Sequence, residues 1–385
     1  MKAHWTLIVG SVAALLLAGG CQANTGAPEE VVIGADLELT GAAASIGNVY
    51  AHALQLKVEQ ANEDGLLGNR KLTLVLRDNR SEPATSAANI TALAADPSVR
   101  ALITGVCAEC VAGAAKSIND AKIPTIALSL SPSVSAPVAD RKYVFKMAPN
   151  IGDDATVLVS ALNDVGAKKI AVVVSDDQFG KDSFEALNSR LTRASISTVA
   201  TERVTADPDK VAAASGRIVR SKAEAVVVLA FSPVSSQVAK GVRDAGYAGR
   251  MLFGSPAADN LFLSGDTAKA MDGASLVFTP TLVSDDIIAS SPAKANRATW
   301  FRDYLSKYGT YAAYASFAAD AVELITQGII QTNGTDRVAL RGAIETTRMD
   351  GLSGPIRLTP DNHSALMPQA VTLLIAANGR WRLSS

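Results

Sequence analysis

The chain has few of the residues that build metal centres. Its 385 residues include three cysteines and three histidines. A structural zinc site needs four ligands, and the histidines lie far apart in the sequence, at His4, His52 and His363. We therefore expect neither a bound metal ion nor a cofactor.

An excess of charge of one sign is also lacking. Lysine and arginine together number 36, against 37 aspartates and glutamates. A nucleic-acid-binding protein usually carries a strongly basic face, so this balance argues against nucleic acid as a partner. The sequence also lacks a Walker A motif and a G-x-S-x-G elbow, the signatures of a phosphate-binding loop and of a nucleophilic serine. We expect a protein that is not an enzyme.

The apolar run at residues 6–20, TLIVGSVAALLLAGG, is shorter than the roughly 20 residues that cross a membrane as a helix. It is typical of the apolar core of a secretory signal peptide. The run ends in LAGGC, which resembles the lipobox of bacterial lipoproteins, although Ala18 stands where leucine is usual. We expect a signal peptide over 1–20, a lipid on Cys21 and a polar tether over 21–30. An ordinary signal peptide cut elsewhere, or an uncleaved anchor, is the alternative.

Strand and helix patterns alternate along the rest of the chain. Of all residues, 48% are hydrophobic, enough for a large core, and the length suits two or three domains. Short apolar runs alternate with helical periodicity up to residue 131, and the same rhythm restarts after the stretch 143–150. From about residue 277 the pattern changes to long helices and then short strands. This alternation predicts two α/β halves with parallel sheets covered by helices on both faces.

Two of the three cysteines form a C-x-x-C pair. Cys107 and Cys110 directly follow the strand predicted over 99–105, at the start of a predicted helix. Such a pair is a redox centre, half of a metal site or a small local staple. Outside the cytoplasm, where the signal peptide would send the mature chain, disulfides persist.

Several stretches occur in an order and spacing that resemble one known family. They are VVIGADLELTGAAASIGN, ANEDGLLGNRKLTLVLRDN, IPTIALSLS, YVFKMAPN, VVVSDDQFGKD, LSGPIRLTPDN and NGRWRL. Together they resemble the branched-chain amino-acid (leucine-binding-like) type of solute-binding protein, the receptor component of ABC importers. The resemblance covers residues 31–383 and implies the type I periplasmic-binding fold.

The resemblance implies an α/β fold with two doubly wound parallel-sheet lobes joined by three crossovers. The crossovers would lie near 148–151, 276–280 and 350–355. The first lobe would comprise 31–148 plus 280–352, and the second lobe 151–276 plus 353–385. The ligand would lie between the lobes, at the carboxyl ends of the strands, and hinge closure would trap it.

The resemblance also implies which residues hold the ligand. On the first lobe, loops after three strands would present small side chains, hydroxyls and backbone N–H groups, which bind anions at helix N-termini. On the second lobe, an aromatic side chain and two further loops would face them. The expected ligand residues are Ser45, Ile46, Cys107, Ala108, Glu109, Ser129, Leu130, Ser131, Phe179, Phe231, Ser232 and Pro256. The serines could also be turn formers and Phe179 a core residue.

Two departures from the family bear on the ligand. Pro256 stands where amino-acid binders carry the carboxylate for the ligand's ammonium group, and Asp259 lies three residues further on. Burying an unpaired ammonium costs several kcal/mol, so a carboxylate without an amine, or another small polar metabolite, becomes a stronger candidate. Ala108 replaces the usual hydroxyl, and the Glu109 that follows it points to solvent or receives a cationic group.

Some relatives bridge the position of Cys107 to a cysteine after the second strand, but the corresponding RDNRSEP has none. The resemblance therefore implies a Cys107–Cys110 disulfide at the lip of the cleft. Two free thiols and a redox pair remain as alternatives.

Taken together, the sequence predicts a monomeric, lipid-anchored, extracytoplasmic solute-binding protein. It would take a small polar ligand, an amino acid or a related carboxylate or amide, to ABC permease subunits in the membrane. The alternative is a ligand-sensing lipoprotein of the same fold that signals to a membrane partner.

Overall fold

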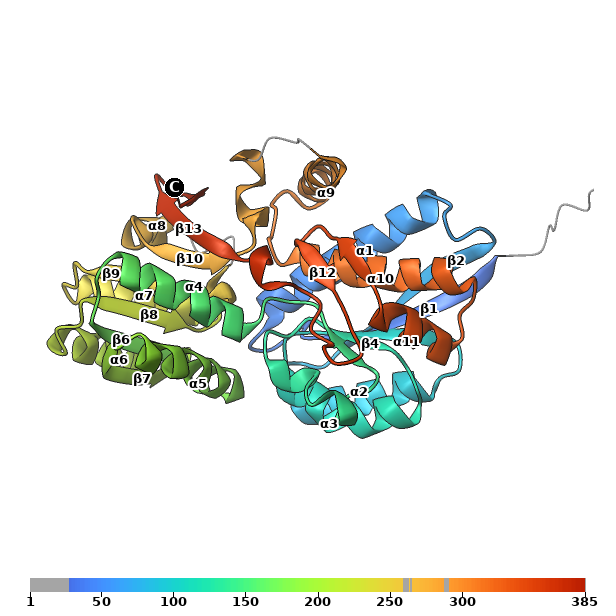
Figure 1. The fold of residues 1–385 in the computed structure, drawn as a ribbon, viewed down its shortest axis with the longest axis horizontal. Coiled ribbons are helices and arrows are strands. Elements are labelled where there is room, and N and C mark those ends of the chain that lie inside the picture. Colours follow the sequence, from blue (N-terminus) through green and yellow to red (C-terminus); the bar gives the residue numbers. More distant parts are fainter. Residues whose placement is uncertain (1–27, 259–262, 264, 287–290, 385) are drawn as a thin grey trace, which may run out of the picture.

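The computed structural model describes residues 28–384, apart from 259–262, 264 and 287–290. The predicted signal peptide, the lipidation site Cys21 and the possible ammonium partner Asp259 lie outside the described residues, as does nearly all of the tether. The described chain forms two lobes side by side, each a sheet covered by helices on both faces (Figure 1). This confirms the predicted two-lobe α/β fold.

The first lobe contains a parallel five-stranded sheet in the order β2-β1-β3-β4-β5. Its inner strands β1, β3 and β4 are buried along most of their length, as expected for a sheet covered by helices on both faces, whereas the edge strand β2 is only partly buried. Helices α1 and α10 cover one face, and α2 and α3 the other. The strands are β1 (Glu29–Leu37), β2 (Arg70–Asp78), β3 (Val99–Thr104), β4 (Thr125–Ala127) and β5 (Val144–Lys146). The helices are α1 (Ala44–Glu63), α2 (Pro83–Ala95), α3 (Ala108–Asp120), α10 (Ala315–Thr332) and α11 (Arg337–Glu345).

The second lobe contains a seven-stranded sheet in the order β14-β13-β10-β9-β8-β6-β7. The strands β10, β9, β8, β6 and β7 are parallel to one another, while β13 runs antiparallel to both β10 and β14. The strands are β6 (Lys169–Ser175), β7 (Ser197–Val204), β8 (Ala225–Leu229), β9 (Arg250–Phe253), β10 (Ser275–Phe278), β13 (Thr372–Ala377) and β14 (Arg380–Leu383). The helices are α4 (Ile151–Asp164), α5 (Gln178–Arg193), α6 (Pro208–Arg220), α7 (Val234–Asp244) and α8 (Gly265–Met271).

The chain passes between the lobes three times. The first passage, residues 147–150, joins β5 to α4, and the second joins β10 to α9 (Pro292–Tyr308), which packs on α1. The third follows the β11–β12 hairpin (Arg348–Asp350 and Pro355–Arg357). It lies at about 366–371, later than the expected 350–355. The reason is that residues 363–365 still bond the edge of β5, with Lys146 N–H donating to His363 O at 2.8 Å.

A buried lysine holds the first passage in place. The Lys146 side chain is 0% exposed, and its Nζ donates to the carbonyl oxygens of Ala148 and Pro149 at 2.7 and 2.9 Å. Burial lowers the pKa of Lys146 to about 7. Burial likewise raises the pKa of Asp154, at the start of α4, to about 7. The crossover is therefore built around two ionisable groups with little water around them.

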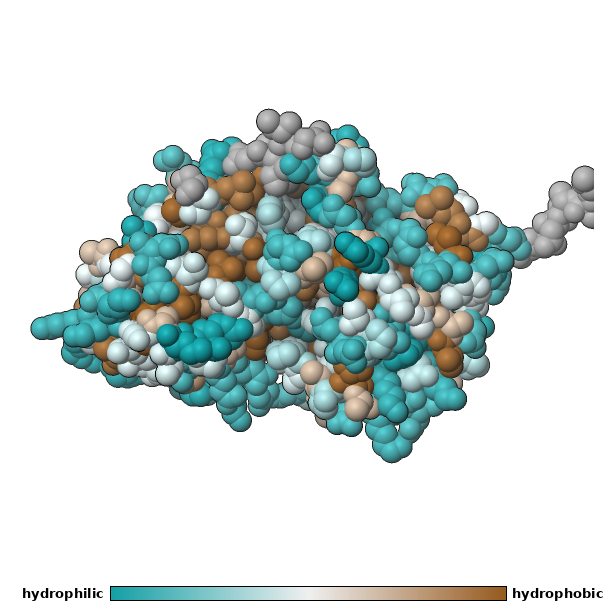
Figure 2. Space-filling model, in the orientation of Figure 1, coloured by the Kyte–Doolittle hydropathy of each residue, from teal (hydrophilic) through white to brown (hydrophobic). Residues whose placement is uncertain are grey.

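A single arginine joins α11 to the far side of the first lobe. The Arg337 guanidinium donates to four backbone carbonyls at the ends of α2, β3 and α3, those of Ala94, Asp96, Val99 and Ala121. One side chain thus ties together the ends of three elements, and the Asp96 carbonyl also accepts the Val99 N–H at 3.2 Å. On the outside, the face in Figure 2 carries hydrophilic residues over both lobes, with smaller apolar areas between them.

Candidate functional site

The two lobes touch where the carboxyl ends of their strands face each other. Ser131, after β4 of the first lobe, donates from Oγ to Oδ2 of Asp182 on α5 of the second lobe, at 2.6 Å. Tyr314, just before α10, donates its hydroxyl to the carbonyl of Ser255, after β9, at 2.7 Å. In doubly wound folds, ligands bind at this end of the strands, so these contacts mark the candidate site.

Four of the eight expected first-lobe residues are buried, and one of them, Ser131, makes the contact with the second lobe. Ser129, Leu130 and Ser131 are at most 1% exposed, and Ser131 N–H donates to Ser129 Oγ at 3.4 Å. Ile46 is buried in the first turn of α1, while its neighbour Ser45 is exposed. The loop after β4 thus faces the second lobe, whereas Ser45 lies outside the contact.

Two of the expected residues on the second lobe form an aromatic pair. The rings of Phe179, at the start of α5, and Phe231, after β8, lie 4.9 Å apart between centroids. Ser232 follows Phe231, and its Oγ lies 3.3 Å from that of Ser236. Pro256 is buried in the turn after β9. The two phenylalanines therefore pair with each other as well as packing on the core.

A buried carboxylate lies behind Pro256, although none occupies that position in the sequence. Asp154 accepts hydrogen bonds from the backbone N–H and the Oγ of Ser255, both at 2.8 Å. It is 2% exposed. Since Ser255 takes both of its oxygens, Asp154 orients the turn after β9.

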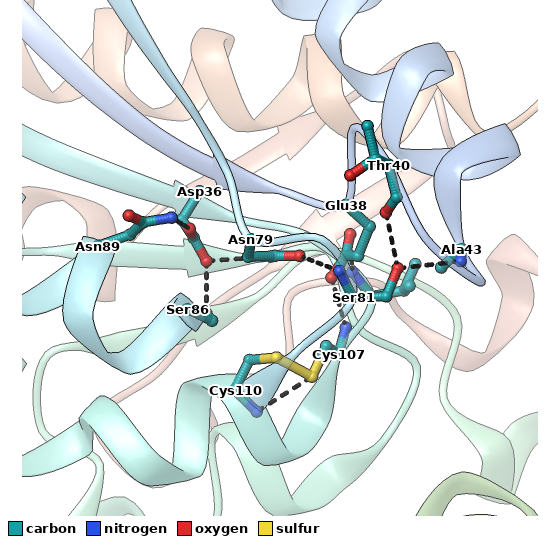
Figure 3. The surroundings of a disulfide bond; sticks show 11 residues. Asp36, Glu38, Thr40, Ala43, Asn79, Ser81, Ser86, Asn89, Cys107 and Cys110 are labelled. Carbon is teal, nitrogen blue, oxygen red and sulfur yellow. Dashed lines mark hydrogen bonds between the residues drawn. A yellow bond between two sulfur atoms is a disulfide. The ribbon is translucent and has the colours of Figure 1, made fainter. Parts of the chain in front are cut away.

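The C-x-x-C pair closes the first turn of α3. Cys107 and Cys110 form a disulfide with an S–S distance of 1.99 Å (Figure 3). Cys110 is buried, Cys107 and Ala108 are half-buried, and the Glu109 side chain is exposed. Cys110 N–H also donates to Cys107 Sγ at 3.2 Å. The bridge fixes the N-terminus of the helix beside the candidate site.

Glu38 is a residue of this site that the sequence analysis did not single out. It follows β1 directly and is 1% exposed. Its Oε2 accepts the Val106 N–H at 3.2 Å, and its Oε1 accepts the Cys107 N–H at 3.1 Å (Figure 3). Burial raises the pKa of Glu38, although these N–H groups oppose the rise. An internal carboxylate thus occupies the anion-binding N–H groups before α3.

Gly105 leaves the room that Glu38 needs. An alanine side-chain carbon at Gly105 would lie 1.8 Å from Glu38 Oε2. On the other side, a side chain at Gly47 in α1 would lie 2.0 Å from the Glu38 carbonyl oxygen. The two glycines therefore bring β1, α1 and the loop after β3 into contact around one carboxylate.

Asp182 is the second residue that the sequence analysis missed. Its Oδ1 accepts from Gln178 Nε2 at 2.6 Å, and its Oδ2 from Ser131 as described. A run such as FGKDSF at the start of a helix gives no sign of which side chain crosses to another lobe. Only the positions of α5 and the loop after β4 bring Asp182 and Ser131 together.

Two cavities lie beside the meeting point. A groove of about 790 Å³ runs between the lobes along the first and third passages, and Asp153, Asp182 and Arg357 contribute to its walls. A smaller cavity of about 340 Å³ lies under α9, against Trp300 and Tyr311. None of the expected ligand residues lines either cavity.

Across residues 28–384, the undescribed positions excepted, no group of three or more His, Cys, Asp or Glu side chains is placed to hold a metal ion. Over the same residues, none of the helices combines the length and apolar character needed to cross a membrane.

Comparisons with known proteins place these features in context. A family model described as "Periplasmic binding protein" matches residues 30–378. The chain is 25% identical over 233 residues to an "Amino acid binding protein" of Pseudomonas aeruginosa, covering 60% of this chain and 61% of the relative. It is 27% identical over 178 residues to the "Chemotactic signal transduction system substrate-binding protein BasB" of Halobacterium salinarum, covering 43% and 42%. It spans less than two thirds of the length of both relatives.

The fold is similar to that of solved structures. The crystal structure of an extracellular ligand-binding receptor from Rhodopseudomonas palustris HaA2 superposes with a TM-score of 0.82 at 22% identity. The match covers 92% of this chain and 99% of the other. At this identity the similarity establishes the shared fold.

Proposed function

This chain belongs to the periplasmic binding protein family, and from that premise we propose that it is the extracytoplasmic, lipid-anchored solute-binding component of an ABC importer. It captures a small polar metabolite between its lobes and delivers it to permease subunits in the membrane. It acts as a monomer and performs no chemistry of its own. Cys21 carries the lipid, and the tether links it to β1, which begins at Glu29.

The observation that carries the proposal is the direct contact between the lobes at the predicted ligand residues. Ser131 reaches across to Asp182, and the only covalent links between the lobes among the described residues are the three passages. Such an arrangement can open and close as a hinge about the passages. A ligand that bridges the lobes replaces this internal contact and stabilises the closed form.

A thermal-shift screen tests solute binding. The full-length protein, purified in mild detergent, is heated with amino acids, carboxylates, amines, amides and polyols. A ligand at 100 times its Kd adds about 2.7 kcal/mol of stability, which is readily measured. A strain lacking the protein should then fail to import the ligand found. Normal uptake in that strain would contradict the transport function.

Anchoring is tested separately from binding. Replacement Cys21→Ser should leave ligand binding unchanged but release the protein from the membrane fraction and prevent labelling with radioactive palmitate. If the variant protein still incorporates label, the lipid is attached elsewhere and the proposed lipobox is wrong.

A second candidate function is ligand sensing, which the similarity to the chemotactic binding protein BasB favours. In that case the protein passes its closed form to a membrane receptor or kinase rather than to a permease. Loss of the protein would then abolish a behavioural or transcriptional response to the ligand while uptake continued. Loss of uptake alone supports transport.

A further inference from the structure

Asp182 places a carboxylate where the lobes meet, and its partners are neutral. One oxygen accepts from the Ser131 hydroxyl and the other from the Gln178 amide, each at 2.6 Å. Within the described residues, Asp182 makes no ion pair with a lysine, arginine or histidine. Ser131 is fully buried, whereas Asp182 is half-buried and also borders the groove between the lobes, from which a ligand can reach it. A carboxylate held only by neutral donors in such a place gains most from a cationic partner.

An aromatic surface lies on the same face of α5. Phe179 precedes Asp182 by three residues, a spacing that puts both side chains on one side of a helix. Phe179 pairs with Phe231, so two rings lie on the wall that carries the carboxylate. Aromatic faces attract organic cations, most strongly where water is excluded. A carboxylate beside two aromatic rings is a suitable site for an ammonium group.

The opposite wall is unfavourable to an anion. Glu38 occupies the N–H groups of Val106 and Cys107 with its own two oxygens. A ligand carboxylate at the loop after β3 would therefore lie next to a buried carboxylate and repel it. The expected ligand residues also include no lysine or arginine. This wall thus has no positive charge for an acid, and its strongest anion-binding groups are taken.

We propose that Asp182 determines specificity, and that the ligand is a small organic amine without a carboxylate whose ammonium group lies between Asp182 and the Phe179–Phe231 pair. The ammonium displaces the Ser131 hydroxyl from Oδ2 and bridges the two lobes. This inference rests on the proposed solute-binding function and names its ligand class. It reverses the preference for a carboxylate that Pro256 suggested, because the charge absent there is supplied from α5.

Matched sets of compounds test the ligand class. Each set contains an amino acid, its decarboxylated amine and its deaminated acid: leucine with 3-methylbutylamine and 4-methylpentanoate, phenylalanine with phenethylamine and 3-phenylpropanoate, and alanine with ethylamine and propanoate. Binding to the full-length protein is measured by titration calorimetry. In the set whose hydrocarbon fits, we expect the amine to bind at least tenfold more tightly than the amino acid or the acid.

Substitutions then test the residue. Asp182→Asn should weaken amine binding at least tenfold, since removing one partner of a charge pair between a ligand and its protein has effects of this size or more. Asp164→Asn, which removes one charge from an exposed position at the end of α4 outside the groove, should change it less than twofold. Urea midpoints and circular dichroism verify that both variants fold, and Asp182→Ser serves if the asparagine variant does not.

The outcomes distinguish failure of this inference from failure of the proposed solute-binding function. Tighter binding of an acid or an amino acid, or equal effects of the two substitutions, overturns the inference and leaves solute binding intact. Binding only of sugars, polyols or amides in the wider thermal-shift screen does the same. Failure of every solute in that screen overturns the solute-binding function itself.

Discussion

Replacing Gly105 by alanine tests the arrangement around Glu38 directly. The added carbon would lie 1.8 Å from Glu38 Oε2, far closer than atoms can approach. The carboxylate is not a free end that can swing away, because the Val106 and Cys107 N–H groups hold it and it is buried. The substitution should therefore push the carboxylate off both N–H groups.

The expected cost follows from those two hydrogen bonds. Hydrogen bonds to a charged group contribute about 1.5–3 kcal/mol each, so Gly105→Ala should lower the free energy of unfolding by about 3 kcal/mol. Glu38→Ala should cost about as much, because it leaves two buried N–H groups without acceptors. With Glu38 already removed, Gly105→Ala meets no carboxylate and should cost less than about 1 kcal/mol. The double-mutant cycle should therefore show a coupling of about 2 kcal/mol.

Urea unfolding of the four proteins measures the cycle. Gly113→Ala, in the middle of α3, is the matched control, since its added carbon would lie in ordinary contact with Ala87 Cβ, at 3.9 Å. That substitution should be neutral or stabilising by up to about 1 kcal/mol. An equal cost of Gly105→Ala with and without Glu38 would show that the clash is not with the carboxylate, and the described geometry would be refuted.

Three further perturbations give measurable results. Reduction of the Cys107–Cys110 disulfide should cost about 2 kcal/mol, as expected for so short a loop, and leave ligand binding intact; a loss of binding that returns on reoxidation would instead favour a redox role. Arg337→Ala should lower the free energy of unfolding by about 3 kcal/mol, because four backbone carbonyls lose a charged donor; a cost below about 1 kcal/mol would show that water replaces it. Because the pKa of Lys146 is about 7 when folded and near 10.5 when unfolded, the unfolded chain binds more protons between these values, and stability should rise by about 1–2 kcal/mol from pH 7 to pH 9. Lys146→Met should abolish that rise in urea midpoints.

The fold could be predicted because it depends on local periodicity. Apolar runs such as those of β3 and β6 are bounded by turn residues and alternate with helical patterns, and each step repeats the same βα unit. Boundaries were harder to predict. Helix α1, for example, begins at Ala44, within a run of small residues that would also suit a turn. The third passage lies further along the chain than predicted, because residues 363–365 pair with a strand more than 200 residues earlier. No local pattern encodes that pairing.

The site could be predicted only as a set of loops. The resemblance identified the loop after β4, whose buried serines do face the second lobe. Glu38 and Asp182 were missed for a physical reason: a carboxylate in DLELTG or FGKDSF is usually a solvated side chain. Their roles arise from contacts with residues far along the chain, such as the Val106 N–H for Glu38. In the sequence, only the glycine at position 105 hints at the buried carboxylate, because a side chain there would collide with it.

Because the chain passes between the lobes three times, segments made late in synthesis complete both sheets. The edge of β5 stays unpaired until residues 363–365 arrive, and the sheet that begins with β6 waits for β13 and β14. Since a ribosome delivers the chain from its N-terminus, both sheets expose an open edge until almost the whole protein has been made. Open edges invite pairing with other chains. These two edges are therefore open to pairing with other chains until the strands that cover them have been made.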